Sequence, residues 1–123
     1  MTASKQLIDE FINSAIEYGE AQASNQPLRK GRAGNAIYRI WQRAKQDSDL
    51  AQSLVDSLLF NSEPNVRLWI CSIALDIDYR AWDAEAMLAE LAKSTSAGAS
   101  AISAKAILDS RQKGINPKGA DLL

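Results

Sequence analysis

The sequence predicts an all-α protein, and three observations support this fold class. Val and Thr each occur only twice in 123 residues, whereas Ala, Leu, Gln, Glu, Lys and Arg are abundant. This composition favours helix over strand. Apolar residues recur at helical spacing in successive runs, and all three prolines fall between those runs.

The first two helices are predicted from Ser4 to about Ala21 and from Pro27 to about Gln46. The polar segment 22–26 connects them, and Pro27 suits the first position of a helix because that position needs no backbone N–H. The apolar positions of the two runs are Leu7, Ile8, Phe11, Ile12, Ala15 and Ile16, followed by Ala33, Ile37, Ile40, Trp41 and Ala44.

Two further helices follow, separated by a break at Asn61. Asp47 and Ser48 are N-cap candidates for the third helix, and Pro64 begins the fourth. Two apolar stripes on the fourth helix predict a central element with neighbours on at least two sides. The stripes consist of Val66, Trp69, Ile70, Ile73, Ala74 and Ile77, and of Leu68, Cys71 and Leu75.

The rest of the chain is predicted to hold the fifth and sixth helices. Asp78 is predicted as the N-cap of the fifth helix, and the small polar run 93–98 separates it from the sixth. Gly114 is expected just after the end of the sixth helix. Six helices with short connectors predict an array of helix pairs in one domain, residues 1–114, and a loosely ordered tail at 115–123.

The segment 63–75, Glu-Pro-Asn-Val-Arg-Leu-Trp-Ile-Cys-Ser-Ile-Ala-Leu, resembles the second half of a HEAT repeat, in which Pro, Val-Arg and Ala-Leu recur in this order. The resemblance implies a right-handed α-α superhelix of about three HEAT-like helical hairpins, each burying one face against the next. It also implies that Arg67 makes structural contacts between repeats. The first hairpin, 4–46, lacks the Pro-x-Val-Arg signature.

More specifically, the chain is similar to a small bacterial family of HEAT-like proteins, the domain of unknown function numbered two thousand and nineteen. The similarity rests on segments 65–69, 75–78, 87–92 and 113–114, and it covers most of the chain. Some relatives are regarded as immunity proteins that act beside secreted toxins. The resemblance therefore implies a protein-binding role, by analogy of fold.

The composition excludes several classes of active site. The chain has no His and a single Cys, Cys71, which excludes Ser/His/Asp and Cys/His nucleophile systems and every metal site that needs His. It also has no glycine-rich phosphate loop. Four acids near a predicted helix start leave helix capping, carboxylate catalysis and divalent-ion binding as alternatives. They are Asp76, Asp78, Asp83 and Glu85. We expect no catalytic, cofactor-binding or metal-ligating residue, and hence no enzyme.

The second helix and its approach are strongly basic, with six basic residues and no acid between Leu28 and Gln46. The six are Arg29, Lys30, Arg32, Arg39, Arg43 and Lys45. Arg32, Arg39 and Arg43 share one polar helical face, which we call the arginine strip. Three interpretations remain open: charges that meet acids of neighbouring helices, a surface for an acidic protein, and a surface for nucleic-acid phosphates.

The aromatic side chains supply further candidates. Trp41 and Trp69 lie on apolar stripes and are expected in the core. Trp82 lies off the apolar stripe of its helix and Tyr38 flanks the arginine strip, so either would suit an interface if exposed. The predicted protein-binding residues are Arg29, Arg32, Tyr38, Arg39, Arg43 and Trp82.

Together these features predict a non-enzymatic helical-repeat module that binds another protein, as an immunity or adaptor protein. The alternative is a helical-repeat protein that binds nucleic acid through the arginine strip, although the net charge of -1 gives no general affinity for it. No apolar run reaches the roughly 18 residues of a membrane span, and the N-terminus lacks the apolar core of a signal peptide. A cytoplasmic location without membrane contact is therefore expected.

Overall fold

A computed structural model describes residues 2–112, and in this range six α-helices follow one another with short connectors. The all-α fold class is thus confirmed. The predicted cap at Gly114 and the tail at 115–123 lie outside the described residues. The helices are α1 (Lys5–Ala23), α2 (Pro27–Gln46), α3 (Ser48–Leu58), α4 (Pro64–Asp76), α5 (Ala81–Ala92) and α6 (Ala99–Gln112), and a 3-10 turn, η1 (Thr95–Ala97), precedes α6.

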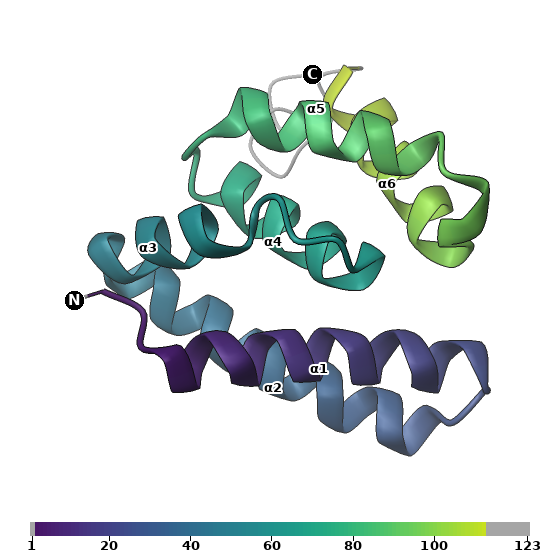
Figure 1. Cartoon of the computed structure of the whole chain (residues 1–123), viewed down its shortest axis with the longest axis horizontal. Helices are drawn as coiled ribbons and strands as arrows, with labels where there is room; N and C mark the ends of the chain where they lie inside the picture. Colours follow the sequence, from purple (N-terminus) through teal and green to yellow (C-terminus); the bar gives the residue numbers. More distant parts are fainter. Residues whose placement is uncertain (1, 113–123) are drawn as a thin grey trace, which may run out of the picture.

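The helices form three pairs that lie in successive layers (Figure 1). The pair α1 and α2 lies at one side of the stack, α3 and α4 lie in the middle, and α5 and α6 lie at the other side. Contacts of α4 with α1 and with α5 join the layers. Neighbouring helices along the chain are therefore also neighbours in space.

The central position predicted for the fourth helix is confirmed, because α4 contacts α1, α3, α5 and α6. Val66, Ile70, Ile73 and Ala74 of its first stripe are fully buried, and Cys71 of the second stripe is fully buried as well. A helix that is apolar on several sides can bury itself only between neighbours, which explains its place in the middle layer.

Every helix contributes to one connected apolar core. The fully buried side chains include Phe11 of α1, Ile37 of α2, Leu54 of α3, Leu88 of α5 and Ala104 of α6. Among them, Phe11 and Ile37 lie on the apolar stripes that helical spacing predicted. The core therefore fixes which face of each helix remains available to a partner.

Side-chain caps define the starts of α1 and α3. Ser4 Oγ accepts a hydrogen bond from the N–H of Leu7 (3.1 Å), and Asp47 Oδ1 accepts one from the N–H of Leu50 (3.1 Å). Of the two cap candidates before α3, Asp47 is the cap and Ser48 is the first helical residue. The prolines predicted to open α2 and α4 stand at the first turn of each helix.

The prediction that Asp78 caps the fifth helix is wrong. α5 begins at Ala81 and its N-cap is Arg80, and both Asp78 and Arg80 have left-handed backbone conformations, with φ of 55° and 53°. The N–H of Tyr79 donates to the carbonyl of Ala74 (3.0 Å) and closes the end of α4. Because Asp78 lies inside this closing turn, the next helix begins only after it.

None of the helices within residues 2–112 is both long enough and apolar enough to cross a membrane. The longest helix, α2, has 20 residues but carries the basic residues described above.

Candidate protein-binding surface

Arg29, in the first turn of α2, is held by acids of α1. Its Nε and Nη2 donate to the two carboxylate oxygens of Glu17, and Nη2 also donates to Glu20 Oε1 (3.0 Å). The hydrogen bonds from Arg29 lower the pKa of the Glu17 carboxyl group, and the same contact raises the pKa of the Arg29 guanidinium. Arg29 therefore joins α2 to α1 and is not free for a partner.

Two lysines of α2 are also engaged within the chain. The ammonium group of Lys30 lies 5.3 Å from the centre of the Tyr18 ring, a cation–π contact. Lys45 Nζ lies 3.6 Å from Asp76 Oδ2, and this oxygen also accepts a hydrogen bond from Trp41 Nε1 (2.8 Å). Half of the basic residues of α2 thus contact other helices.

The arginine strip is the other half. Arg32, Arg39 and Arg43 are exposed, and none of their guanidinium groups forms an ion pair or hydrogen bond with another residue of the range 2–112. At roughly 100° per residue they fall within about 40° of one another around the helix. At about 1.5 Å per residue the row is about 16 Å long. Three arginine side chains without an ion pair or hydrogen bond in this range therefore line one face of α2.

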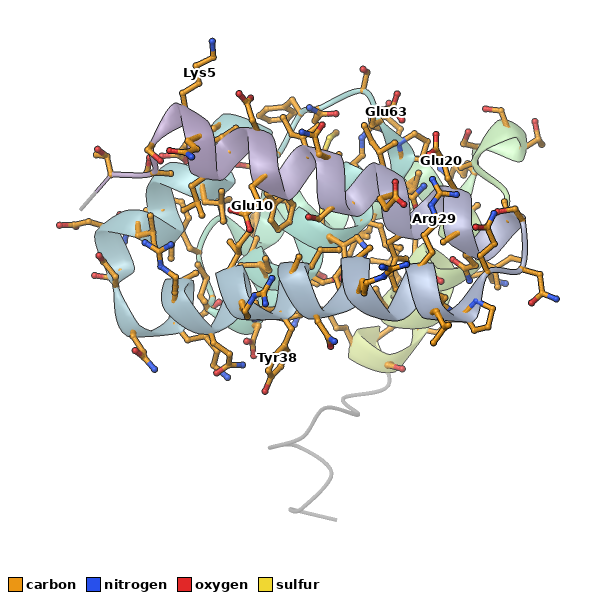
Figure 2. The ribbon with its side chains drawn as sticks, turned by 90° about the horizontal axis from the view of Figure 1, so that it is seen from below. Lys5, Glu10, Glu20, Arg29, Tyr38 and Glu63 are labelled. Atoms are coloured by element: carbon orange, nitrogen blue, oxygen red, sulfur yellow. The ribbon has the colours of Figure 1, made fainter. Side chains whose placement is uncertain are left out.

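A groove of about 530 Å³ lies between α1 and α2, beside the arginine strip. Figure 2 shows the two helices side by side across this face, with Arg29 and Glu20 close together where the helices approach. The small side chains of Ala33 and Ala36 leave the groove open on the α2 side. The other residues that border it are Asn13, Ser14, Glu17, Arg29 and Arg32.

The six predicted site residues do not form one surface. Tyr38 is 60 % exposed, but it projects from the edge of α2 that faces away from α1 (Figure 2). Trp82 is 88 % exposed and belongs to α5, in the layer farthest from α2 (Figure 1). Both aromatic residues are available to partners. Neither extends the groove beside the strip.

Three of the four acids considered for catalysis or ion binding form separate side-chain contacts. Asp76 binds Lys45 and Trp41, Asp83 binds Arg80, and Glu85 lies 3.6 Å from Arg111. Asp78, the fourth, lies in the turn after α4. Across residues 2–112 no group of three or more His, Cys, Asp or Glu is placed to hold a metal ion.

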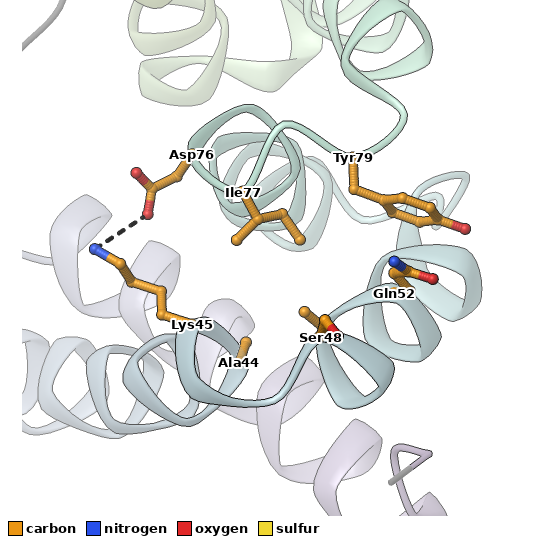
Figure 3. A pocket seen from close by; sticks show the side chains of 8 residues that line it. Ala44, Lys45, Ser48, Gln52, Asp76, Ile77 and Tyr79 are labelled. Atoms are coloured by element: carbon orange, nitrogen blue, oxygen red, sulfur yellow. Dashed lines mark ion pairs between the residues drawn. The ribbon is translucent and has the colours of Figure 1, made fainter. Parts of the chain in front are cut away.

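A second hollow, of about 310 Å³, lies where the end of α2 and the start of α3 meet the end of α4 (Figure 3). Lys45 and Asp76 form its charged side, Ile77 points into it, and Gln52 and Ser48 lie opposite. Sequence reasoning missed this hollow because it joins residues from three helices. The only signal in the sequence was the pair of opposite charges, Lys45 and Asp76, near the ends of two predicted helices.

Trp41 and Trp69 pack on the core, as predicted, although each is half-buried. The Trp69 ring meets the Tyr18 ring edge-on with centroids 5.2 Å apart, and it meets the Trp41 ring in the same way at 6.3 Å. Such edge-to-face pairs add about 0.5–1.5 kcal/mol beyond burial. Arg67 donates from Nε to the carbonyl of Asn61 (3.1 Å), so its contact lies within the α3–α4 hairpin.

Comparison of the chain with protein-family models, curated proteins and solved structures gives no match. The resemblance to HEAT-like proteins therefore stays a prediction. The side chains that the fold exposes, chiefly the arginine strip, are the remaining guide to function.

Proposed function

We propose that the protein is a non-enzymatic helical-repeat module that binds an acidic surface of another protein through the arginine strip. In this proposal the three helix pairs are HEAT-like hairpins in a right-handed superhelix, and the protein acts as an adaptor or immunity protein. The observation that carries the proposal is the contrast within α2: Arg29 bonds carboxylates of α1, whereas no arginine of the strip forms an ion pair or hydrogen bond among residues 2–112.

Electrostatics supports this assignment. Exposed arginines keep their charge at every physiological pH, and their planar guanidinium groups match carboxylates in a two-bond geometry. Three such groups on one helical face set the orientation and association rate of an acidic partner more than its affinity. Affinity would then come from the packed contacts around them.

The side chains available for chemistry support a non-enzymatic role. The chain has no His, and burial raises the pKa of its one thiol, Cys71, to about 12. A thiol with so high a pKa is a poor nucleophile near neutral pH. Three of the candidate acids each form an ion pair with a basic side chain: Asp76, Asp83 and Glu85.

The proposal is tested by reversing charge at the strip. Arg32, Arg39 and Arg43 are changed together to Glu, and the protein is co-expressed with products of neighbouring genes and purified by affinity. The matched control changes Lys5, Lys93 and Lys105 to Glu, which shifts the net charge equally at exposed positions outside the strip. Figure 2 shows Lys5 projecting away from α2. A partner lost only from the strip variant is the expected result.

Two results would overturn the proposal. The first is a partner that both variants retain equally well. The second is nucleic acid bound through the strip, recognised by a logarithmic salt dependence with a slope near -3, because about 0.9 counterions are released for each phosphate contact. The second result would instead establish the nucleic-acid alternative.

A further inference from the structure

The last layer of the stack turns large apolar side chains to solvent. Trp82 of α5 is 88 % exposed and Ile102 of α6 is 74 % exposed. Both helices pack on α4, and no further layer follows them within residues 2–112 (Figure 1). The end of a helical stack normally carries a polar outer face that keeps the protein soluble. Two large apolar side chains at this end therefore indicate a surface that binds another molecule.

Helical spacing groups the exposed residues of these two helices. On α5, Trp82, Ala86 and Lys93 fall within about 40° of one another at roughly 100° per residue. They lie opposite Ala84, which is fully buried. An equivalent exposed row on α6 lies opposite the buried Ala104. We call the two rows the terminal face, which consists of Trp82, Ala86 and Lys93 on α5 and of Ile102, Ala106 and Asp109 on α6.

The two ends of the terminal face differ in charge. The start of α5 lies beside the end of α6, because Glu85 Oε1 is 3.6 Å from Arg111 Nη2. Asp109 therefore lies at the same end of the face as Trp82, and Lys93 lies at the other end. The side chains of Lys93 and Asp109 have no ion-pair or hydrogen-bond partner within residues 2–112. One end is thus acidic and aromatic, and the other end is basic.

We propose that the terminal face binds the terminal face of a second copy of this chain, about a twofold axis that runs across α5 and α6. In such a contact the same surface is used by both copies and must be complementary to itself. The axis places each helix antiparallel to its counterpart, so the basic end of one copy meets the acidic, aromatic end of the other. Ala86 and Ala106 project only a methyl group, which lets the helices approach closely where they cross.

Two pairs of residues make the surface complementary to itself. Lys93 faces Trp82 of the second copy, where an ammonium group over an indole ring forms a favourable cation–π pair. Lys105 precedes Asp109 by one turn of α6, is exposed, and has no partner in the range 2–112. It faces Asp109 of the second copy. A uniformly charged partner such as a nucleic acid would be repelled at one end of the face, whereas a second copy is matched at both ends.

The contact involves only two helices from each copy, so it buries less area than an obligate dimer and dissociates in dilute solution. The arginine strip lies on α2, in the first layer, and takes no part in it. Dimerisation and binding at the strip are therefore tested by different variants, and either can fail without the other.

Analytical ultracentrifugation of the full chain over a wide range of concentration tests the proposal. A reversible equilibrium between monomer and dimer is expected. Trp82→Ala should raise the dissociation constant by at least about tenfold, because Trp82 occurs twice in the contact and aromatic residues dominate such interfaces. Leu28→Ala is the matched control, because Leu28 is 82 % exposed but belongs to α2, and it should leave the constant unchanged. Circular dichroism checks the fold of each variant.

An exchange of charge tests the twofold geometry. Lys105→Asp leaves only acids at the two facing positions of α6, and Asp109→Lys leaves only bases. Each variant alone should dimerise several-fold more weakly, because like charges then face each other. An equimolar mixture of the two should recover the parent affinity as a heterodimer, and the double variant should recover it alone. Lys5→Asp, on α1, is the control for net charge and should have no effect.

A protein that stays monomeric at every concentration would overturn the proposal and leave the terminal face to a different protein. A dimer that Trp82→Ala does not weaken would also overturn it, because another surface would then hold the two copies together. A mixture that associates no better than the separate variants would show that α6 does not face its counterpart, and the twofold contact would be wrong.

Discussion

Ser100 Oγ donates a hydrogen bond of 3.0 Å to Asn65 Oδ1 and so ties the start of α6 to the start of α4. Ser100 is buried, and the bond satisfies its hydroxyl group. On its other side, the Asn65 amide lies against Gly19 of α1, where an added Cβ would stand 1.9 Å from Nδ2. Asn65 thus touches helices of all three layers, and Gly19 is the residue that makes room for it.

Gly19→Ala should lower the free energy of unfolding by about 1–3 kcal/mol, because the methyl group displaces the Asn65 amide and leaves the Ser100 hydroxyl unpaired. In an Asn65→Ala background the methyl group has space. Alanine is favoured over glycine within a helix by roughly 0.5–1 kcal/mol, so the same substitution should there become neutral or stabilising. Urea unfolding of the four proteins measures this coupling. Additive effects would contradict the contact.

Trp69 and Trp82 should differ sharply in their contribution to stability. Trp69 packs edge-on against Tyr18 and Trp41, so Trp69→Ala should cost about 3 kcal/mol. Trp82 is 88 % exposed, so Trp82→Ala should change stability by less than about 0.5 kcal/mol. Denaturant unfolding of both variants gives the comparison. A large loss at Trp82 would mean that it packs against a neighbour in solution.

Cys71 should be unreactive in the folded protein. Its side chain is fully buried, and burial raises the thiol pKa to about 12, so very little thiolate exists near neutral pH. An aromatic disulfide reagent should react at a rate set by unfolding, and the rate should rise when urea is added. Because Cys71 is the only cysteine, the signal needs no assignment. Fast reaction without denaturant would contradict the burial.

Helical periodicity predicted the elements well because the buried apolar residues of each helix recur at helical spacing. The spacing that assigned Trp69 to a stripe and excluded Trp82 also anticipated their difference in exposure. Periodicity could not predict which basic residues of α2 form ion pairs. Arg29 and Arg32 are three positions apart on one helix, yet only Arg29 faces Glu17 closely enough to bond. That difference depends on how α1 is aligned along α2. The apolar spacing within each helix gives no information about this alignment.

The same alignment determines which arginines support stability. Arg29→Gln removes the hydrogen bonds to Glu17 and Glu20, so its thermal midpoint should fall below that of the parent protein. Arg39→Gln removes no hydrogen bond or ion pair within residues 2–112 and should leave the midpoint unchanged. High salt should reduce the difference by screening the exposed carboxylates. Equal midpoints for the two variants at low salt would show that the Arg29 contacts contribute nothing to folding.

The Asp47 cap should make stability depend on pH in the acid range. The hydrogen bond from the N–H of Leu50 lowers the pKa of the Asp47 carboxyl group in the folded protein. A group whose pKa is lowered on folding stabilises the protein above its unfolded pKa, and this stabilisation is lost as the pH falls through the folded pKa. Asp47→Asn keeps an oxygen acceptor but cannot ionise. The parent protein should therefore melt higher than the variant near neutral pH.

The advantage of the parent should shrink below about pH 4, where a carboxyl group with an ordinary pKa becomes protonated, and should be smallest near the acid limit of folding. Thermal unfolding of both proteins across this range measures the difference. Ser4→Ala is the matched control, because it removes the cap of α1, whose hydroxyl does not titrate. Its cost should stay constant with pH. An Asp47→Asn difference that is equally constant would show that the charge of Asp47 does not support the cap.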